Sequence, residues 1–156
     1  MIMWEKALGF GVDIPFVELL GFELTGFAEG RSEILFPPKP EHLNSFSVTH
    51  GGALMTLLDV SMATAARSVA PDMGVVTIEM KTSFMQPAVP GLGPLVARGE
   101  LMHRTATMAF TQATVFDSNG KACAHATGTF KYVKRLATGS RSINALNAAP
   151  GTLSTD

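Results

Sequence analysis

The chain has 156 residues, of which 46% are hydrophobic and only 16% are charged. This length fits one domain with a substantial core, and this composition excludes a disordered chain and suggests that some surface is hidden between subunits. The net charge of -1 gives no basic surface for nucleic acid or for an anionic membrane.

The single cysteine, Cys123, excludes a disulfide framework and a thiolate metal site. The first ten residues, MIMWEKALGF, carry an acid and lack a long apolar run, so they do not have the pattern of a signal peptide. No stretch reaches the roughly 18 to 20 uninterrupted apolar residues of a spanning helix. We therefore expect a soluble cytoplasmic protein.

The first predicted elements are a short helix and a hairpin. Residues 13–21 indicate a helix with Asp13 as its cap, a proline in its first turn and Gly21 as its stop. Residues 22–38 then read as two strands joined by a turn at Glu29-Gly30, and a double proline ends the second strand.

A long apolar helix follows the loop of residues 39–49. From Gly51 to about Val69 there is no proline and, after the opening pair, no glycine, while alanine, leucine and methionine dominate. Pro71 and Gly74 close this segment. A helix with so few polar positions must be covered nearly all round, which one curled sheet and a second copy of the chain would achieve.

Four strands are predicted after the helix, at residues 75–86, 93–104, 105–116 and 121–133, and a turn at Asn119-Gly120 joins the last two. Strict alternation in the first of them would separate an apolar face from a polar one; the apolar face is Val76, Ile78, Met80 and Phe84, and the polar face is Thr77, Glu79, Lys81 and Ser83. The expected fold class is α+β, an antiparallel sheet of about five to six strands wrapped around one long helix. We expect a single domain over residues 1–135 and a polar tail over residues 136–156.

Asp59 is the only formally charged residue between Asn44 and Ala66. An exposed aspartate, or one paired with Arg67, would be an ordinary explanation, and on the residues alone it is about as good as a functional one. However, the helical neighbours of Asp59 at three and four positions are Met55, Thr56, Met62 and Ala63, so no polar face surrounds it. A carboxylate in an apolar cleft can take a proton from water or attack a carbonyl carbon directly.

The spacing of Asn44, His50-Gly51-Gly52 and Asp59 resembles the motif of hotdog-fold acyl-CoA thioesterases, in the subfamily of the phenylacetate-degradation and 4-hydroxybenzoyl-CoA thioesterases. The segment VVTIEMKTSFMQPAVPG resembles their strand after the central helix, and the order of elements matches over roughly residues 13–134. The resemblance implies hydrolysis of an acyl-CoA thioester by a homo-oligomer without a metal or cofactor. In related thioesterases the HGG loop and the acid come from different chains.

The resemblance also implies roles for single residues, each with an ordinary alternative. Gly51 and Gly52 would offer free N–H groups to the thioester carbonyl, although glycine pairs more often serve close packing. His50 would hold the carbonyl or the loop, or simply cap the helix. Asn44 would orient the attacking water or brace the loop. Thr77 would contact the water or the carboxylate, or would be an ordinary strand threonine.

Other chemistries have less support. The phosphates of CoA need cations, and Arg104 is the candidate from a pool that also holds Arg67, Lys81, Lys131, Lys134 and Arg135. The four histidines lack a metal-ligand spacing, no G-x-S-x-G segment is present, and Cys123 reads as a packing residue. Two other functions stay open: a hotdog hydratase or dehydratase, and a non-catalytic acyl-CoA-binding protein. The sequence leaves the acyl group open, and also whether Asp59 acts as base or nucleophile.

Overall fold

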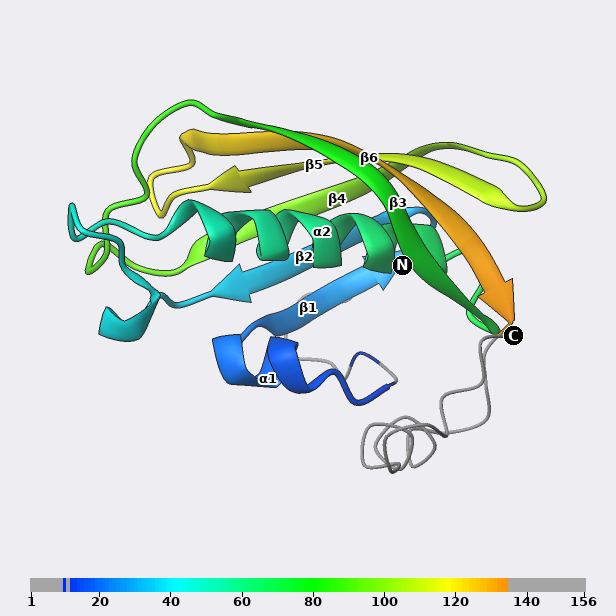
Figure 1. The fold of residues 1–156 in the computed structure, drawn as a ribbon, viewed down its shortest axis with the longest axis horizontal. Helices are drawn as coiled ribbons and strands as arrows, with labels where there is room; N and C mark the ends of the chain where they lie inside the picture. The colour runs from blue at the N-terminus through cyan, green and yellow to red at the C-terminus, as the bar shows by residue number, and fades with distance from the viewer. Residues whose placement is uncertain (1–9, 11, 135–156) are drawn as a thin grey trace, which may run out of the picture.

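The computed structural model describes residue 10 and residues 12–134, which form one six-stranded antiparallel sheet curled around a long helix (Figure 1). The strand order is β1-β2-β4-β5-β6-β3. The elements are α1 (Pro15–Leu20), β1 (Glu23–Ala28), β2 (Arg31–Phe36), the 3-10 helix η1 (Pro40–His42), α2 (Gly51–Arg67), β3 (Met73–Phe84), β4 (Leu95–Arg104), β5 (Met108–Phe116) and β6 (Ala122–Lys134). The predicted α+β hotdog architecture is confirmed, while the tail predicted at residues 136–156 lies outside the described residues.

The first helix and the hairpin show where local chemistry fixes the chain. The cap of α1 is Ile14 and not Asp13, and it makes no side-chain cap hydrogen bond. The reason is the following proline, which keeps its preceding residue extended, so that Asp13 comes one position too early to cap the helix. The predicted turn is present, with φ of 52° at Glu29 and 80° at Gly30, and such a turn matches the twist of paired strands.

The helix α2 lies on the concave side of the sheet and supplies the centre of the core. Leu57, Leu58 and Met62 are fully buried there. At Gly99 of β4 a Cβ atom would overlap the carbonyl group of Ser61, so only glycine permits this close approach of helix and strand. The contact holds α2 in a fixed position over the sheet, and with it every side chain that the helix carries.

A β-bulge in β3 changes which side chains face the helix. Thr77 pairs with Phe130 and Met80 pairs with Gly128, with a register shift between Thr77 and Glu79. Phe130 and Gly128 are both buried on the helix side, so Thr77 and Met80 face the same way although three positions separate them. The expectation that Thr77 shares the outer face with Glu79 and Lys81 is therefore wrong.

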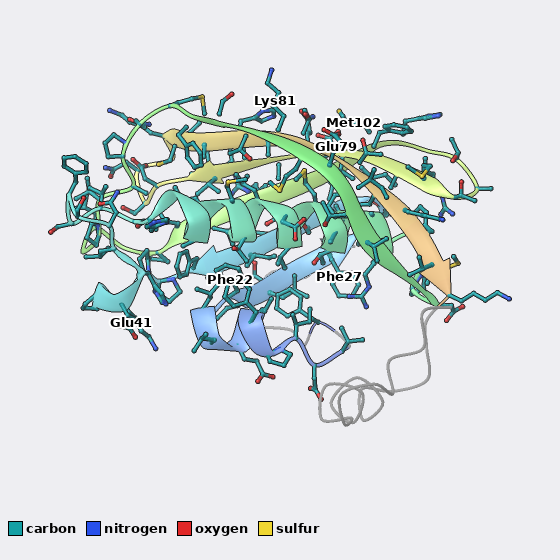
Figure 2. The ribbon with its side chains drawn as sticks, in the orientation of Figure 1. Phe22, Phe27, Glu41, Glu79, Lys81 and Met102 are labelled. Atoms are coloured by element: carbon teal, nitrogen blue, oxygen red, sulfur yellow. The ribbon has the colours of Figure 1, made fainter. Side chains whose placement is uncertain are left out.

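The strand β3 forms one edge of the sheet and is twelve residues long. Two of its apolar side chains, Val76 and Ile78, are about half exposed. Lys81 points away from α2 on the outer side of the sheet (Figure 2). An edge of this length with apolar side chains is suited to pairing with another strand.

In the described part of the chain, no helix is long and apolar enough to cross a membrane.

Candidate active site

The centre of the candidate site is a contact between the long helix and the edge strand. The hydroxyl Oγ1 of Thr77 donates a hydrogen bond of 2.7 Å to Oδ1 of Asp59. The bulge makes this contact possible, because it turns Thr77 toward α2. The predicted contact between Thr77 and the carboxylate is thus present in the structure.

The surroundings of Asp59 favour its protonated form. Partial burial raises the pKa of this carboxyl above its ordinary value, and the hydrogen bond from Thr77 acts in the opposite direction but more weakly. A carboxylate with a raised pKa is a better proton acceptor, and perturbed groups of this kind are enriched at functional sites.

The start of α2 leaves one backbone donor without a partner. The N–H groups of Ala53 and Leu54 donate to the carbonyl of His50, at 3.0 and 3.2 Å. The N–H of Gly52 donates to Nδ1 of His50 at 2.8 Å. The expectation from the HGG pattern that this N–H is free for the thioester carbonyl is therefore wrong. Only the N–H of Gly51 has no acceptor among the described residues, and it remains for a ligand.

The ring of His50 has a defined role at this helix end. Its Nδ1 accepts from Gly52, so in the neutral ring Nε2 carries the proton and can donate to a ligand. A Cβ atom at Gly52 would lie 3.0 Å from this Nδ1, so the second glycine makes room for the imidazole. His50 is therefore the cap of α2, and its side chain is exposed at the helix start.

Asn44 braces the loop that leads into the helix. Its Oδ1 accepts from the N–H groups of Phe46 and Val48, at 2.9 and 3.3 Å. These two donors fix the amide so that Oδ1 points into the loop. Its Nδ2 has no partner among the described residues and can donate to a water molecule or to substrate.

The structure does not bring all the predicted site residues together within one chain. Asp59 lies eight residues beyond Gly51, about 12 Å along the helix axis. Arg104 lies at the other end of α2, where its guanidinium stacks 4.7 Å from the ring centre of Tyr132 and donates to the carbonyl of Val69. One group consists of Asn44, His50 and Gly51; the other consists of Asp59 and Thr77.

Sequence reasoning missed Phe84 as a neighbour of the site. A Cβ atom placed on Gly51 would lie 3.4 Å from Cε1 and Cζ of this ring, so the ring rests against the first residue of α2. The only sequence signal was a large aromatic residue at the end of the strand that follows the helix.

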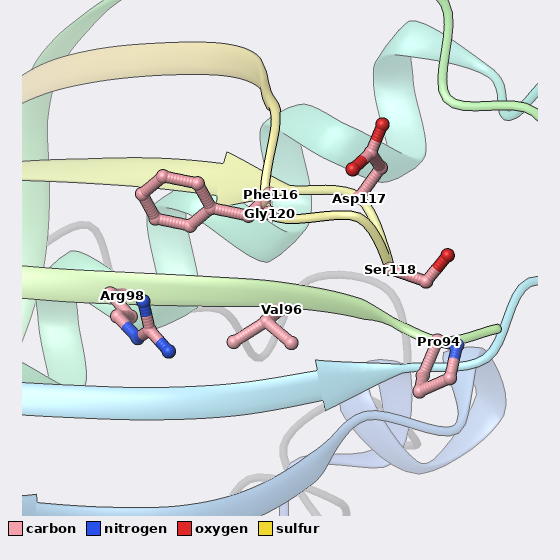
Figure 3. A pocket seen from close by; sticks show the side chains of 7 residues that line it. All are labelled: Pro94, Val96, Arg98, Phe116, Asp117, Ser118 and Gly120. Atoms are coloured by element: carbon pink, nitrogen blue, oxygen red, sulfur yellow. The ribbon is translucent and has the colours of Figure 1, made fainter.

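A hollow separate from the candidate site lies on the face of the sheet away from α2 (Figure 3). Its charged groups are already engaged in contacts within the chain. Its volume is about 360 Å³. Arg98 in its wall pairs with Glu33 at 3.1 Å, and Oδ1 of Asp117 accepts from the N–H groups of Asn119 and Lys121. The hollow is lined by Pro94, Val96, Arg98, Phe116, Asp117, Ser118 and Gly120.

Cys123 is fully buried, as expected of a packing residue. Burial, and secondly the negative charge of Asp117, raise the pKa of its thiol, which makes a thiolate nucleophile unfavourable. Within residues 12–134, no group of three or more histidine, cysteine, aspartate or glutamate side chains is placed to hold a metal ion.

The chain is similar to several known proteins. A protein of Thermoplasma acidophilum that bears a provisional esterase name, Ta0293, is 27% identical over 77% of this chain and 89% of its own length. The conserved protein PA5202 of Pseudomonas aeruginosa is 27% identical, with a TM-score of 0.74 over 79% of this chain and 97% of that one. A variant of the phenylacetic acid degradation protein PaaI from Thermus thermophilus is 26% identical, with a TM-score of 0.68 over 76% of this chain and 98% of that one.

The family model of the Thioesterase superfamily matches residues 46–124, about half of the chain. The match contains the HGG segment, the whole of α2 and the edge strand that contacts its aspartate. The chain belongs to the thioesterase superfamily.

Proposed function

We propose that this protein hydrolyses an acyl-CoA thioester to the free acid and CoA, with Asp59 as the acid-base or nucleophilic group. The observation that carries the proposal is the half-buried carboxylate, held by Thr77 and with a raised pKa, in the middle of an otherwise apolar helix. Membership of the thioesterase superfamily supports thioester hydrolysis as the reaction class.

In the general-base form of the reaction, Asp59 takes a proton from water while the water oxygen attacks the thioester carbonyl carbon. The carbonyl oxygen becomes an oxyanion and accepts a hydrogen bond from the free N–H of Gly51, a type of contact that stabilises such a state by about 3 kcal/mol. Nε2 of His50 and Nδ2 of Asn44 donate to the carbonyl and to the water. Collapse of the intermediate expels the CoA thiolate, which receives the proton from Asp59. If Asp59 attacks directly, the intermediate is an anhydride that water then hydrolyses.

The complete site needs two chains, because one helix does not bring its own Gly51 and Asp59 to the same carbonyl. About 12 Å separates them, whereas a base and an oxyanion donor must each lie about 3 Å from their reacting atoms. A second copy related by a two-fold axis would place Gly51 of one subunit near Asp59 of the other. The long edge strand β3, with Val76 and Ile78 exposed, offers a surface for such a partner. We therefore propose a homodimer at minimum, and a tetramer as a dimer of dimers.

The test is release of free thiol from a panel of acyl-CoA esters. The panel includes phenylacetyl-CoA because of the likeness to a phenylacetic acid degradation protein, together with aliphatic chains. We expect steady turnover by the parent, and Asp59→Asn should lower kcat by about a thousandfold while the far-ultraviolet circular dichroism is unchanged. Asn keeps the volume of the side chain and can still accept from Thr77, so the fold should be retained.

Three other results would contradict the proposal. Water addition to an enoyl-CoA without thiol release would indicate a hydratase. Binding of acyl-CoA without any reaction would indicate a binding protein. Turnover by Asp59→Asn near the parental rate would show that another group carries the chemistry.

A further inference from the structure

We propose that Phe84 determines the acyl specificity of the proposed site, and that it selects an uncharged apolar acyl group over one that ends in a second carboxylate. This inference rests on the proposed thioester hydrolysis. It names the substrate class that the start of α2 accepts.

The position of Phe84 on the strand explains its exposure. It pairs with Ala124, a fully buried residue, so it follows the bulge on the helix-facing side of β3. Nevertheless 52% of its surface is exposed, because it lies at the end of the strand beside the first residue of the helix and not beneath the helix. An aromatic ring in this position leaves apolar area that a bound acyl group would remove from water.

The ring is also next to the proposed oxyanion donor. It rests against Gly51, whose N–H is the one helix-start donor without an acceptor in the described residues. A thioester oxygen that accepts from this N–H brings one of the two groups on the same carbonyl, the acyl carbon or the CoA sulfur, towards Phe84, and we assign the acyl group to this side because the ring is apolar. The ring is therefore the first apolar surface of this chain that the acyl group meets.

Other exposed apolar side chains lie in the segments that meet here. A hydrogen bond from the N–H of Thr49 to the carbonyl of Ala88 joins the loop before α2 to the segment after β3, and Figure 1 shows these segments near each other. The large apolar side chains that are exposed in these segments and in the first turns of α2 are Phe46, Met55, Phe84, Met85, Val89 and Leu92. Large exposed apolar side chains in segments that are joined in this way are more typical of a binding site than of a solvated face.

Charge argues against a second carboxylate on the acyl chain. Neither residues 40–66 nor residues 82–97 contain a lysine or an arginine. A substrate carboxylate placed there would lose solvation without an ionic partner, and the carboxylate of Asp59 would repel it.

The experiment compares hexanoyl-CoA with adipoyl-CoA, which have the same chain length and differ by one terminal carboxylate. We expect kcat/KM of the parent to be at least about tenfold higher for hexanoyl-CoA. Phe84→Ala should lower kcat/KM for hexanoyl-CoA by about tenfold and change the value for adipoyl-CoA much less, while Phe84→Leu should keep most of the preference. The matched control is Phe16→Ala on α1, since Phe16 is a phenylalanine of similar exposure, at 55%, away from this helix end. This control variant should leave kcat/KM unchanged for both esters.

Several outcomes would overturn the assignment of Phe84. These are equal kcat/KM of the parent for both esters, an equal loss for both in Phe84→Ala, and a change in assembly mass in Phe84→Ala by light scattering, which would make Phe84 a subunit contact. If the parent releases thiol neither from these two esters nor from any other member of the acyl-CoA panel, the proposed function fails. Calorimetric binding of the two ketone analogues, in which CH2 replaces sulfur, then decides the specificity separately: tighter binding of the hexanoyl analogue, lost in Phe84→Ala, supports it, and equal binding overturns it.

Discussion

At the scale of single residues, Asp59 is subject to two opposing influences. Partial burial raises its pKa, and the hydroxyl of Thr77 stabilises its charged form. The first makes the carboxylate a better proton acceptor, while the second keeps more of it ionised at a given pH. A base that must be both ionised and reactive needs such a balance, and the bulge in β3 supplies it by turning Thr77 inward.

Replacement of Thr77 should therefore shift the pH dependence of the reaction. Thr77→Val keeps the shape of the side chain but removes the hydrogen bond that lowers the pKa of Asp59, so this pKa should rise further. In the proposed mechanism the active form of Asp59 is the carboxylate, so activity should be present above this pKa and lost as the pH falls through it. The acid limb of kcat/KM against pH should move to higher pH, and the rates of variant and parent should converge at alkaline pH.

Thr77→Ser is the matched control for this measurement, because it keeps the hydroxyl and should keep the parental acid limb. A shift of the limb to lower pH in Thr77→Val, or a uniform loss at every pH, would show that Thr77 does not act through the ionisation of Asp59.

At the scale of elements, the start of α2 depends on the fit between His50 and Gly52. Gly52→Ala would place a methyl group 3.0 Å from Nδ1 of the capping ring and displace it. We expect kcat/KM to fall by about tenfold, since the displaced ring no longer presents Nε2–H at the helix start. His50→Ala should cause a similar loss. In a chain with both changes the methyl group meets no ring, so the double variant should be no worse than His50→Ala. Additive losses from the two changes would contradict this coupling.

The elements were predictable where one local rule decides them. The long apolar run after Gly51 predicted α2, and Glu29-Gly30 predicted the hairpin turn. The bulge in β3 was not predictable, because Ile78 reads as an ordinary strand residue and the extra residue shows only in pairing with β6. The sequence left open whether His50 caps the helix or holds the carbonyl, since the direction of a side chain is not encoded in the HGG spacing.

At the scale of the whole molecule, the candidate site is divided along α2 in each chain. The family that the pattern of Asn44, HGG and Asp59 indicated is confirmed, but spacing alone does not say which residues share a carbonyl. The helix geometry excludes a shared carbonyl for Gly51 and Asp59 of one chain, because a rise of about 1.5 Å per residue separates them by more than a carboxylate can reach. The proposed homodimer solves this problem, and an experiment with two inactive chains tests it.

The two chains carry Asn44→Ala and Asp59→Asn, each expected to be inactive alone, and are refolded together with different affinity tags so that only mixed assemblies are purified. In a mixed dimer with composite sites, one site carries both changes and the other carries neither, because Asn44 and Asp59 of one site come from different chains. The mixed dimer should therefore recover up to about half of the parental turnover. If each site lay within one chain, every site would keep one change, and verified mixed dimers would stay inactive. Refolding each variant with itself is the control for refolding losses. A stable monomer by light scattering at micromolar concentration would exclude the shared site from the outset.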